Sequence, residues 1–236
     1  MAGPKTIESG TLLIGSAFPY PPFELERDQT DTGFDAELMR AICGQIGLRW
    51  KLVKYRGDDF DRIFDGLRTG DYDTVVSGTA ITPEREKVAL FSAPYLEAAQ
   101  SLVVNTTRTP EVTSTDELSD QVVGVQTGHT SDLVARELQA EGKLRDIRYY
   151  PRAGLVDALD DLDAGRVGGF ITLLPVATWL VKERPDLAVV QELSTLERLG
   201  IAFGPGNVGL RDAVNRALAE CRSNGTLERL ERRWLQ

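Results

Sequence analysis

One short stretch of this sequence gathers several groups that can bind a small anion. Residues 77–85 read Ser-Gly-Thr-Ala-Ile-Thr-Pro-Glu-Arg and follow an apolar strand at 74–76. Thr82 suits the N-cap of a helix that begins at Pro83, where a missing N–H costs nothing. Arg85 then lies in the first turn, beside free backbone N–H groups and the positive end of the helix. The segment predicts a carboxylate receptor; the alternative is an ordinary strand-to-helix loop with Arg85 on the surface.

A second turn of similar character occurs at residues 127–132, Thr-Gly-His-Thr-Ser-Asp, which also enter a predicted helix. Ligands of doubly wound sheets bind beyond the carboxyl ends of the strands, where both turns are expected. If the chain folds into two facing lobes, both helix starts can point at one ligand. His129 is the only histidine, and a helix start favours its neutral form, so a polar contact is expected rather than catalysis.

The sequence shows no catalytic constellation and no cofactor motif. Ser77 has no evident base, and the acids near the proposed site, Glu24, Glu84 and Glu97, show no paired spacing. One histidine and two cysteines far apart argue against a metal site, and no phosphate-binding glycine loop is present. We therefore expect a binding protein without metal or cofactor.

Composition narrows the class of partner. The chain has 27 basic and 36 acidic residues, a net charge of −9, which argues against binding to nucleic acid or to anionic membranes. No apolar run approaches the roughly 18–20 residues of a membrane helix, and no signal peptide is evident. Cys43 and Cys221 are expected to be buried thiols, or a disulfide if the first and last helices are neighbours.

Alternating strands and helices must position these turns. Phe34, Leu38 and Ile42 mark one face of a helix over 34–46, which Gly47 ends. The alternation predicts a mainly parallel sheet with helices outside. Strands are expected at 11–15, 50–53, 74–76, 121–126, 147–149, 170–171 and 200–203, and further helices at 60–67, 133–138, 155–162, 174–179, 210–221 and 227–234.

The chain is weakly self-similar. Residues 65–70, Asp-Gly-Leu-Arg-Thr-Gly, match 160–165, Asp-Asp-Leu-Asp-Ala-Gly, and each precedes a short strand and a turn. Glycine-terminated helices before strands are common, so a single match carries little weight. Two matched units in matched order favour two similar α/β lobes.

Several motifs in order give the chain a family resemblance. It resembles the polar amino-acid binding proteins of bacterial ABC importers, solute-binding protein family 3. The motifs are Pro-Pro-Phe-Glu at 21–24, Gly-Phe-Asp at 33–35, Gly-Asp-Tyr-Asp at 70–73, Ile-Thr-Pro-Glu-Arg at 81–85, Phe-Ser-Ala-Pro-Tyr at 91–95, Gly-Ile-Ala at 200–202, and Asn-Gly-Thr-Leu at 224–227 with Trp234.

The resemblance implies a type II periplasmic-binding-protein-like fold, in which two α/β lobes joined by two crossover strands close on a ligand. Lobe one would be residues 1–97 plus 205–236, and lobe two residues 98–204. It implies a monomer located outside the cytoplasm, periplasmic or lipid-anchored at the cell surface. Its partner would be an ABC permease in the membrane, and no nucleic acid is expected.

The resemblance also implies a ligand site. Arg85 would grip the ligand's carboxylate, assisted by the loops around Ser77 and Gly128, while Tyr20 and Phe60 would flank the side chain. The full predicted set is Tyr20, Phe60, Ser77, Gly78, Ala80, Arg85, Gln126, His129, Thr130 and Leu173.

The half of the family site that holds an α-ammonium is missing. The carboxylate that pairs with it would stand at Leu173, an assisting hydroxyl at Ala80, and an acid of some members at Ala17. A buried ammonium without a charged partner costs several kcal/mol. We therefore expect a small carboxylate whose amine is absent or masked. A shift of register near residue 173 would instead offer Asp160, Asp161 or Asp163 as a partner.

Two other functions share these features. The same fold serves as the sensing module of receptors and kinases, which the sequence does not separate from transport. Some members resemble cyclohexadienyl dehydratases, which carry a catalytic glutamate shortly after the second-lobe strand. Residues 173–176 read Leu-Leu-Pro-Val here, without an acid, so enzymatic activity is not expected.

Overall fold

A computed structural model describes residues 5–236, which divide into two compact units. Unit 1 holds the described residues up to Arg56, together with Arg62–Glu97 and Arg198–Gln236. Unit 2 holds Gly57–Asp61 and Ala98–Glu197. The first four residues of the expected lobe one lie outside the described residues.

This division differs from the expected lobes in two segments. Residues 198–204 belong to unit 1 rather than to the second lobe, because strand β14 of this segment pairs with β5. Residues 57–61 belong to unit 2, where the N–H of Phe60 donates to the carbonyl of Thr127 at 3.1 Å. The chain passes from unit 1 to unit 2 between Glu97 and Ala98.

Unit 1 is built on a five-stranded sheet in the order β4-β1-β5-β14-β6. Strands β4, β1 and β5 run parallel, and β14 runs antiparallel to both its neighbours. The strands are β1 Thr11–Ser16, β4 Arg49–Lys54, β5 Thr74–Val75, β6 Leu90–Phe91 and β14 Ala202–Phe203.

Unit 2 repeats this plan with a sheet in the order β10-β9-β11-β8-β12. Strands β10, β9 and β11 are parallel, whereas β8 is antiparallel to β11 and β12. The strands are β8 Gln100–Asn105, β9 Val122–Gln126, β10 Asp146–Tyr150, β11 Gly169–Leu173 and β12 Leu187–Glu192. The matched strand orders are what the weak self-similarity of the sequence predicted.

Both sheets are mixed, so the prediction of a mainly parallel sheet is only partly correct. Strands β8 and β14 follow directly after β7 (Leu96–Ala98) and β13 (Glu197–Leu199), along which the chain passes from one unit to the other. β7 and β13 pair with each other in a two-stranded sheet.

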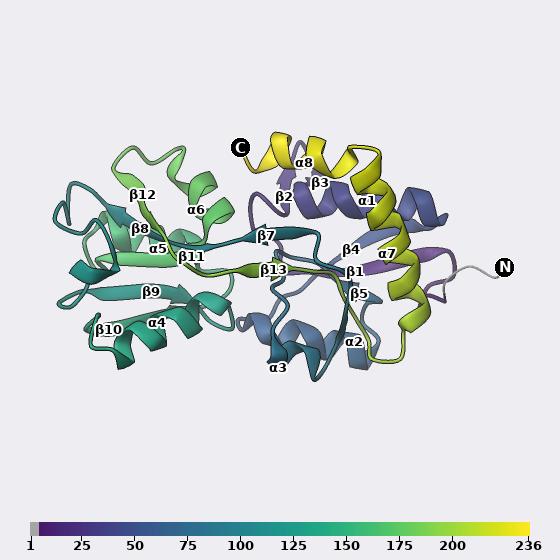
Figure 1. Cartoon of the computed structure of the whole chain (residues 1–236), viewed down its shortest axis with the longest axis horizontal. Helices are drawn as coiled ribbons and strands as arrows, with labels where there is room; N and C mark the ends of the chain where they lie inside the picture. Colours follow the sequence, from purple (N-terminus) through teal and green to yellow (C-terminus); the bar gives the residue numbers. More distant parts are fainter. Residues whose placement is uncertain (1–4) are drawn as a thin grey trace. The chain divides into compact units, whose positions relative to one another are not determined.

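Helices cover both sheets. In unit 1, α1, α7 and α8 pack against one another (Figure 1). The helices are α1 Phe34–Ile46, α2 Asp65–Thr69, α3 Pro83–Glu86, α7 Val208–Ser223 and α8 Thr226–Trp234 in unit 1, and α4 Thr130–Ala140, α5 Leu155–Asp163 and α6 Leu174–Val181 in unit 2. Short 3-10 helices occur at Phe60–Phe64 and Thr115–Glu117.

Local sequence explains several of these boundaries. Helix α1 begins and ends where the apolar period predicted, and Gly47 adopts the left-handed conformation with φ 72° that ends it. Cys43 of α1 and Cys221 of α7 are both buried free thiols, although their helices are in contact, so no disulfide joins them. The hairpin of β2 (Leu25–Arg27) and β3 (Thr30–Thr32) was not predicted.

One apolar core cluster of unit 2 lies beneath α4. Its buried members come from the sheet, from α4 and from the loops between them. They are Leu102, Val104, Val112, Leu118, Val123, Val125, Ala135, Leu144, Ile171 and Leu193. This packing holds the ends of β9 and β11, and the start of α4, in fixed positions.

Candidate ligand-binding site

Arg85 is held inside unit 1 by the loop that precedes it. Thr82 caps α3, its hydroxyl accepting the N–H of Arg85 at 3.2 Å, and Pro83 is the first helical residue as predicted. The Arg85 side chain is only 6% exposed. Its Nη1 donates to the carbonyl of Ala80 at 3.0 Å, and the guanidinium lies 5.4 Å from the ring centre of Phe64. Arg85 is therefore a buried, positioned cation and not a surface residue.

Ser77 and Gly78 follow β5 as predicted, but their donors are already used. The Ser77 hydroxyl donates to the carboxylate of Glu24 and accepts the N–H of Ala17 at 3.2 Å. The N–H of Gly78 donates to Oδ2 of Asp35 at 2.7 Å. Asp35 therefore takes the Gly78 N–H, and Glu24 takes the Ser77 hydroxyl, so neither of these donors is left for a ligand.

Asp35, which accepts the Gly78 N–H of this loop, is a titratable group with a strongly raised pKa. It lies in the first turn of α1 and is fully buried, and this burial raises its pKa to about 7 against the lowering effect of the Gly78 N–H. Tyr95 lies close by: burial, followed by the charge of Asp35, raises its pKa well above the usual value. The loop after β5 thus rests on a carboxyl group that titrates near neutrality.

The remaining unit 1 residues of the predicted set are also buried. Tyr20 stacks on Phe23 with ring centres 6.0 Å apart and an interplanar angle of 17°. Ala80 forms an isolated β-bridge with Leu199. Unit 1 therefore brings five predicted residues to the edge at which β1 and β5 end. They are Tyr20, Ser77, Gly78, Ala80 and Arg85.

Unit 2 holds the other five residues of the predicted set, which are Phe60, Gln126, His129, Thr130 and Leu173. The turn after β9 places His129 at the N-cap of α4, where its ring centre lies 4.8 Å from that of Phe60. Gly128 has φ 77°, and a Cβ there would lie 2.1 Å from the carboxylate of Asp59. Only glycine fits this close approach, which fixes the 57–61 segment against the turn.

Gln126 and Leu173 end β9 and β11, so they share the same sheet edge as Thr130. Nε2 of Gln126 donates to the carbonyl of Arg152 at 2.6 Å. Leu173 is 4% exposed and stands directly opposite Gln100 of β8 in the antiparallel ladder. The position that the resemblance assigns to an ammonium-binding acid is thus apolar and buried.

Residues 12–236 match the family of bacterial extracellular solute-binding proteins, family 3. The chain belongs to this family. Over 227 residues, this chain is 31% identical to "ABC transporter arginine-binding protein 1" of Escherichia coli K12. The match covers 94% of this chain and 89% of that protein. It is 31% identical over 232 residues to the "L-cystine-binding protein TcyJ" of the same strain, covering 98% and 84%.

Solved structures agree with the family. The family 3 protein resembles "an ancestral arginine-binding protein bound to arginine" with a TM-score of 0.87 and 32% identity, covering 96% of this chain and 99% of that chain. It also resembles "the ancestral amino acid-binding protein AncCDT-1, a precursor of cyclohexadienyl dehydratase", with a TM-score of 0.86 and 32% identity, covering 98% and 97%. The two-lobed type II fold expected from the sequence is therefore the fold of this family 3 protein.

Sequence reasoning missed two polar residues, Gln100 and Asp35, and named Glu24 only as a nearby acid. All three are buried, and each contacts a residue of the predicted set. Gln100 begins β8, whose centre is apolar, and an amide at the start of a buried strand is the signal that could have found it. Asp35 interrupts the buried face of α1 in the same way.

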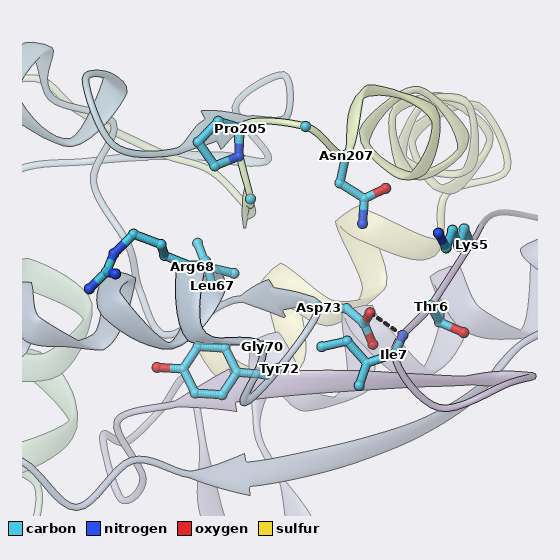
Figure 2. A pocket seen from close by; sticks show the side chains of 12 residues that line it. Lys5, Thr6, Ile7, Leu67, Arg68, Gly70, Tyr72, Asp73, Pro205 and Asn207 are labelled. Carbon is cyan, nitrogen blue, oxygen red and sulfur yellow. Dashed lines mark hydrogen bonds between the residues drawn. The ribbon is translucent and has the colours of Figure 1, made fainter.

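A separate cavity of about 510 Å³ lies at the other edge of the unit 1 sheet (Figure 2). Asp73 closes it on one side by accepting the N–H groups of Ile7 and Leu13 at 2.8 and 2.9 Å. Its other lining residues include Lys5 and Arg68, which are exposed. Over residues 5–236 of this family 3 protein, no helix has the length and apolar character to cross a membrane.

Proposed function

We propose that this family 3 protein captures a small, amino-acid-like carboxylate outside the cytoplasm and presents it to an ABC permease. Family membership supports solute binding, and the relatives named for arginine and cystine support an amino-acid-like ligand. The proposal of a carboxylate ligand rests on Arg85. Its guanidinium is buried and donates to the carbonyl of Ala80, in the loop after β5. A buried cation of this kind gains strongly from a bidentate carboxylate partner.

The α-substituent of this ligand would be uncharged or masked. Leu173 offers no charge to an ammonium, and neither Ala80 nor Ala17 offers a hydroxyl or an acid. Desolvating an ammonium against these side chains would cost several kcal/mol. The ligand class we favour is therefore a carboxylate with an apolar or aromatic side chain and no free amine.

We propose binding rather than turnover. The segment 173–176, Leu-Leu-Pro-Val, offers no general acid after β11, although one structural relative is described as a precursor of a dehydratase. Incubation of the purified protein with prephenate or arogenate should leave both unchanged. Formation of product by the wild type, and its loss on substitution of a site residue, would replace this proposal with an enzymatic one.

The test of the proposed function is a thermal-shift and calorimetric screen of amino acids, hydroxy acids, keto acids and N-acyl amino acids. Arg85→Ala should weaken binding of every acid that binds the wild type by at least about 100-fold, since breaking a buried ion pair costs about 3–5 kcal/mol. Arg85→Lys should recover only part of this loss, because lysine lacks the bidentate fork.

Arg68→Ala is the matched control, because the Arg68 side chain is 77% exposed and belongs to the same unit. It should bind the same acids as the wild type. Circular dichroism establishes that each variant is folded before affinity is compared. Undiminished affinity in folded Arg85→Ala would show that the carboxylate binds elsewhere.

A further inference from the structure

The side chain of Gln100 lies beside the position where the ammonium-binding acid is missing. Gln100 begins β8 and is paired directly with Leu173 of β11. Directly opposed residues of an antiparallel ladder place their side chains on the same face, with Cβ atoms about 4.5–5.5 Å apart. Gln100 is therefore the polar residue closest in register to Leu173.

The orientation of the Gln100 amide is fixed by its partners. Nε2 donates to Oγ1 of Thr130 at 3.0 Å and to Oε1 of Glu197 at 3.1 Å. A carboxylate only accepts hydrogen bonds, so the amide must turn its nitrogen, and not its oxygen, toward Glu197. Both N–H bonds are then used, and Oε1 points away from Glu197.

Oε1 of Gln100 is an unpaired acceptor. The residue is 1% exposed, and the part of the chain that the structure describes offers Oε1 no hydrogen-bond partner. The backbone of Gln100 is satisfied: its N–H donates to Oγ1 of Thr195 and its carbonyl accepts the N–H of Leu193, each at 2.8 Å. An unsatisfied buried carbonyl destabilises the ligand-free protein, and a hydrogen-bond donor on the ligand would remove this cost.

Glu197 strengthens this acceptor. A carboxylate that accepts from the amide nitrogen draws the N–H protons toward itself and increases the negative charge on the carbonyl oxygen. A neutral donor can satisfy this oxygen with one hydrogen bond, whereas an ammonium would in addition have to lose its water beside the apolar Leu173.

We propose that Gln100 is a specificity-determining residue, whose carbonyl oxygen accepts a hydrogen bond from a neutral O–H or N–H on the α-carbon of the ligand. This inference rests on the proposed function. It narrows the ligand to a hydroxy acid or an N-acyl amino acid, and it discriminates against the keto acid of the same skeleton. Sites built to accept a substrate donor reject the analogue that lacks it, because the acceptor is then left unpaired.

The test uses four acids with one aromatic skeleton: phenyllactate, N-acetylphenylalanine, phenylpyruvate and phenylalanine. In calorimetry, the wild type should bind at least one of the first two about tenfold or more tighter than phenylpyruvate and phenylalanine. Gln100→Met keeps the length of the side chain and removes the acceptor. It should reduce the preference over phenylpyruvate to nearly one, by weakening the donor-bearing acid alone.

Gln139→Met, on the exposed face of α4, is the control and should keep the wild-type preference. If Gln100→Met does not fold, Gln100→Asn replaces it, because its shortened amide cannot reach the same donor, and it should also lose the preference. An unchanged preference in either folded variant would overturn this inference and leave the proposed function standing. Phenylalanine as the tightest ligand would overturn this inference together with the proposed absence of a free amine, and would leave standing only the capture of a carboxylate. Failure of the wild type to bind any carboxylate of the wider screen would overturn both.

Discussion

At the level of a single residue, we propose that Leu173 determines which α-substituent the site accepts. It is buried at the end of β11, opposite Gln100, and is apolar where the family pattern places a charged residue. Since one tenfold change in affinity corresponds to only 1.4 kcal/mol, a single carboxylate at this position is enough to change the ligand class.

Leu173→Asp should therefore improve the binding of α-amino acids by at least about tenfold, because it supplies the counter-charge that a desolvated ammonium needs. The ligand-free variant should unfold at a lower temperature, since it buries an unpaired carboxylate, and an amino acid should restore part of that loss. A thermal-shift panel of amino acids measures both effects.

Leu173→Asn is the control for size and polarity without charge, and it should not gain amino-acid binding. The ammonium argument is wrong if Leu173→Asp shows the same amino-acid panel as the wild type. The same outcome would arise from a shift of register that places Asp160, Asp161 or Asp163 at the site, but the structure places these acids elsewhere. Asp160 and Asp163 pair with Arg184, and Asp161 pairs with Arg148 and Arg166.

At the level of elements, helix α1 supports the loop after β5 through one ionisable contact. Asp35 lies in the first turn of α1 and accepts the N–H of Gly78, the residue that begins the loop. Burial raises the pKa of Asp35 to about 7, whereas an unfolded aspartate titrates near 3.9. Between these values the folded chain holds a proton that the unfolded chain has lost.

Through Asp35 the free energy of unfolding should therefore decrease as the pH rises from about 5 to about 8, by roughly 2 kcal/mol. The sign follows because the folded state binds more protons in this window. Asp35→Asn keeps an acceptor for the Gly78 N–H but cannot ionise, so its stability relative to the wild type should increase with pH. Urea unfolding of both proteins at the two pH values measures this difference.

Asp28→Asn provides the matched control, since Asp28 is exposed and its left-handed conformation suits asparagine. It should leave the pH dependence of stability unchanged. If Asp35→Asn and the wild type lose stability in parallel between the two pH values, Asp35 is already ionised in the folded protein at the lower pH.

Elements governed by local sequence were predictable, and those governed by distant partners were not. The apolar period of α1 and its end at Gly47 both depend on residues close together in the sequence, and the bounds of this helix were predicted correctly. The burial of Asp35 depends on Gly78, 43 residues away, and the role of Gln100 depends on its register with Leu173. Neither pairing leaves a local pattern, so the sequence predicted the edge of each sheet but not the contacts that these polar side chains make.

For the whole molecule, charge is distributed unevenly between the two units. Unit 2 carries 19 acidic and 9 basic residues, whereas unit 1 carries 17 and 18. The net negative charge is therefore concentrated in unit 2, which holds Leu173 and Gln100. Arg85 belongs to unit 1, which is nearly neutral. An approaching carboxylate experiences the repulsion of the whole chain long before it reaches the buried guanidinium.

Salt should therefore speed the capture of an anionic ligand. The repulsion acts through solvent and is screened over about 8–10 Å at physiological ionic strength, whereas a buried contact with Arg85 is screened much less. The association rate constant of phenyllactate should increase several-fold between about 0.02 and about 0.5 M sodium chloride, as measured by stopped-flow tryptophan fluorescence. The dissociation rate constant of phenyllactate, measured in the same experiments, is the control for effects of salt on the protein itself, because screening of the long-range repulsion should leave it nearly unchanged. A rate constant that decreases with salt would mean that a local positive field at Arg85, and not the net negative charge, governs the encounter.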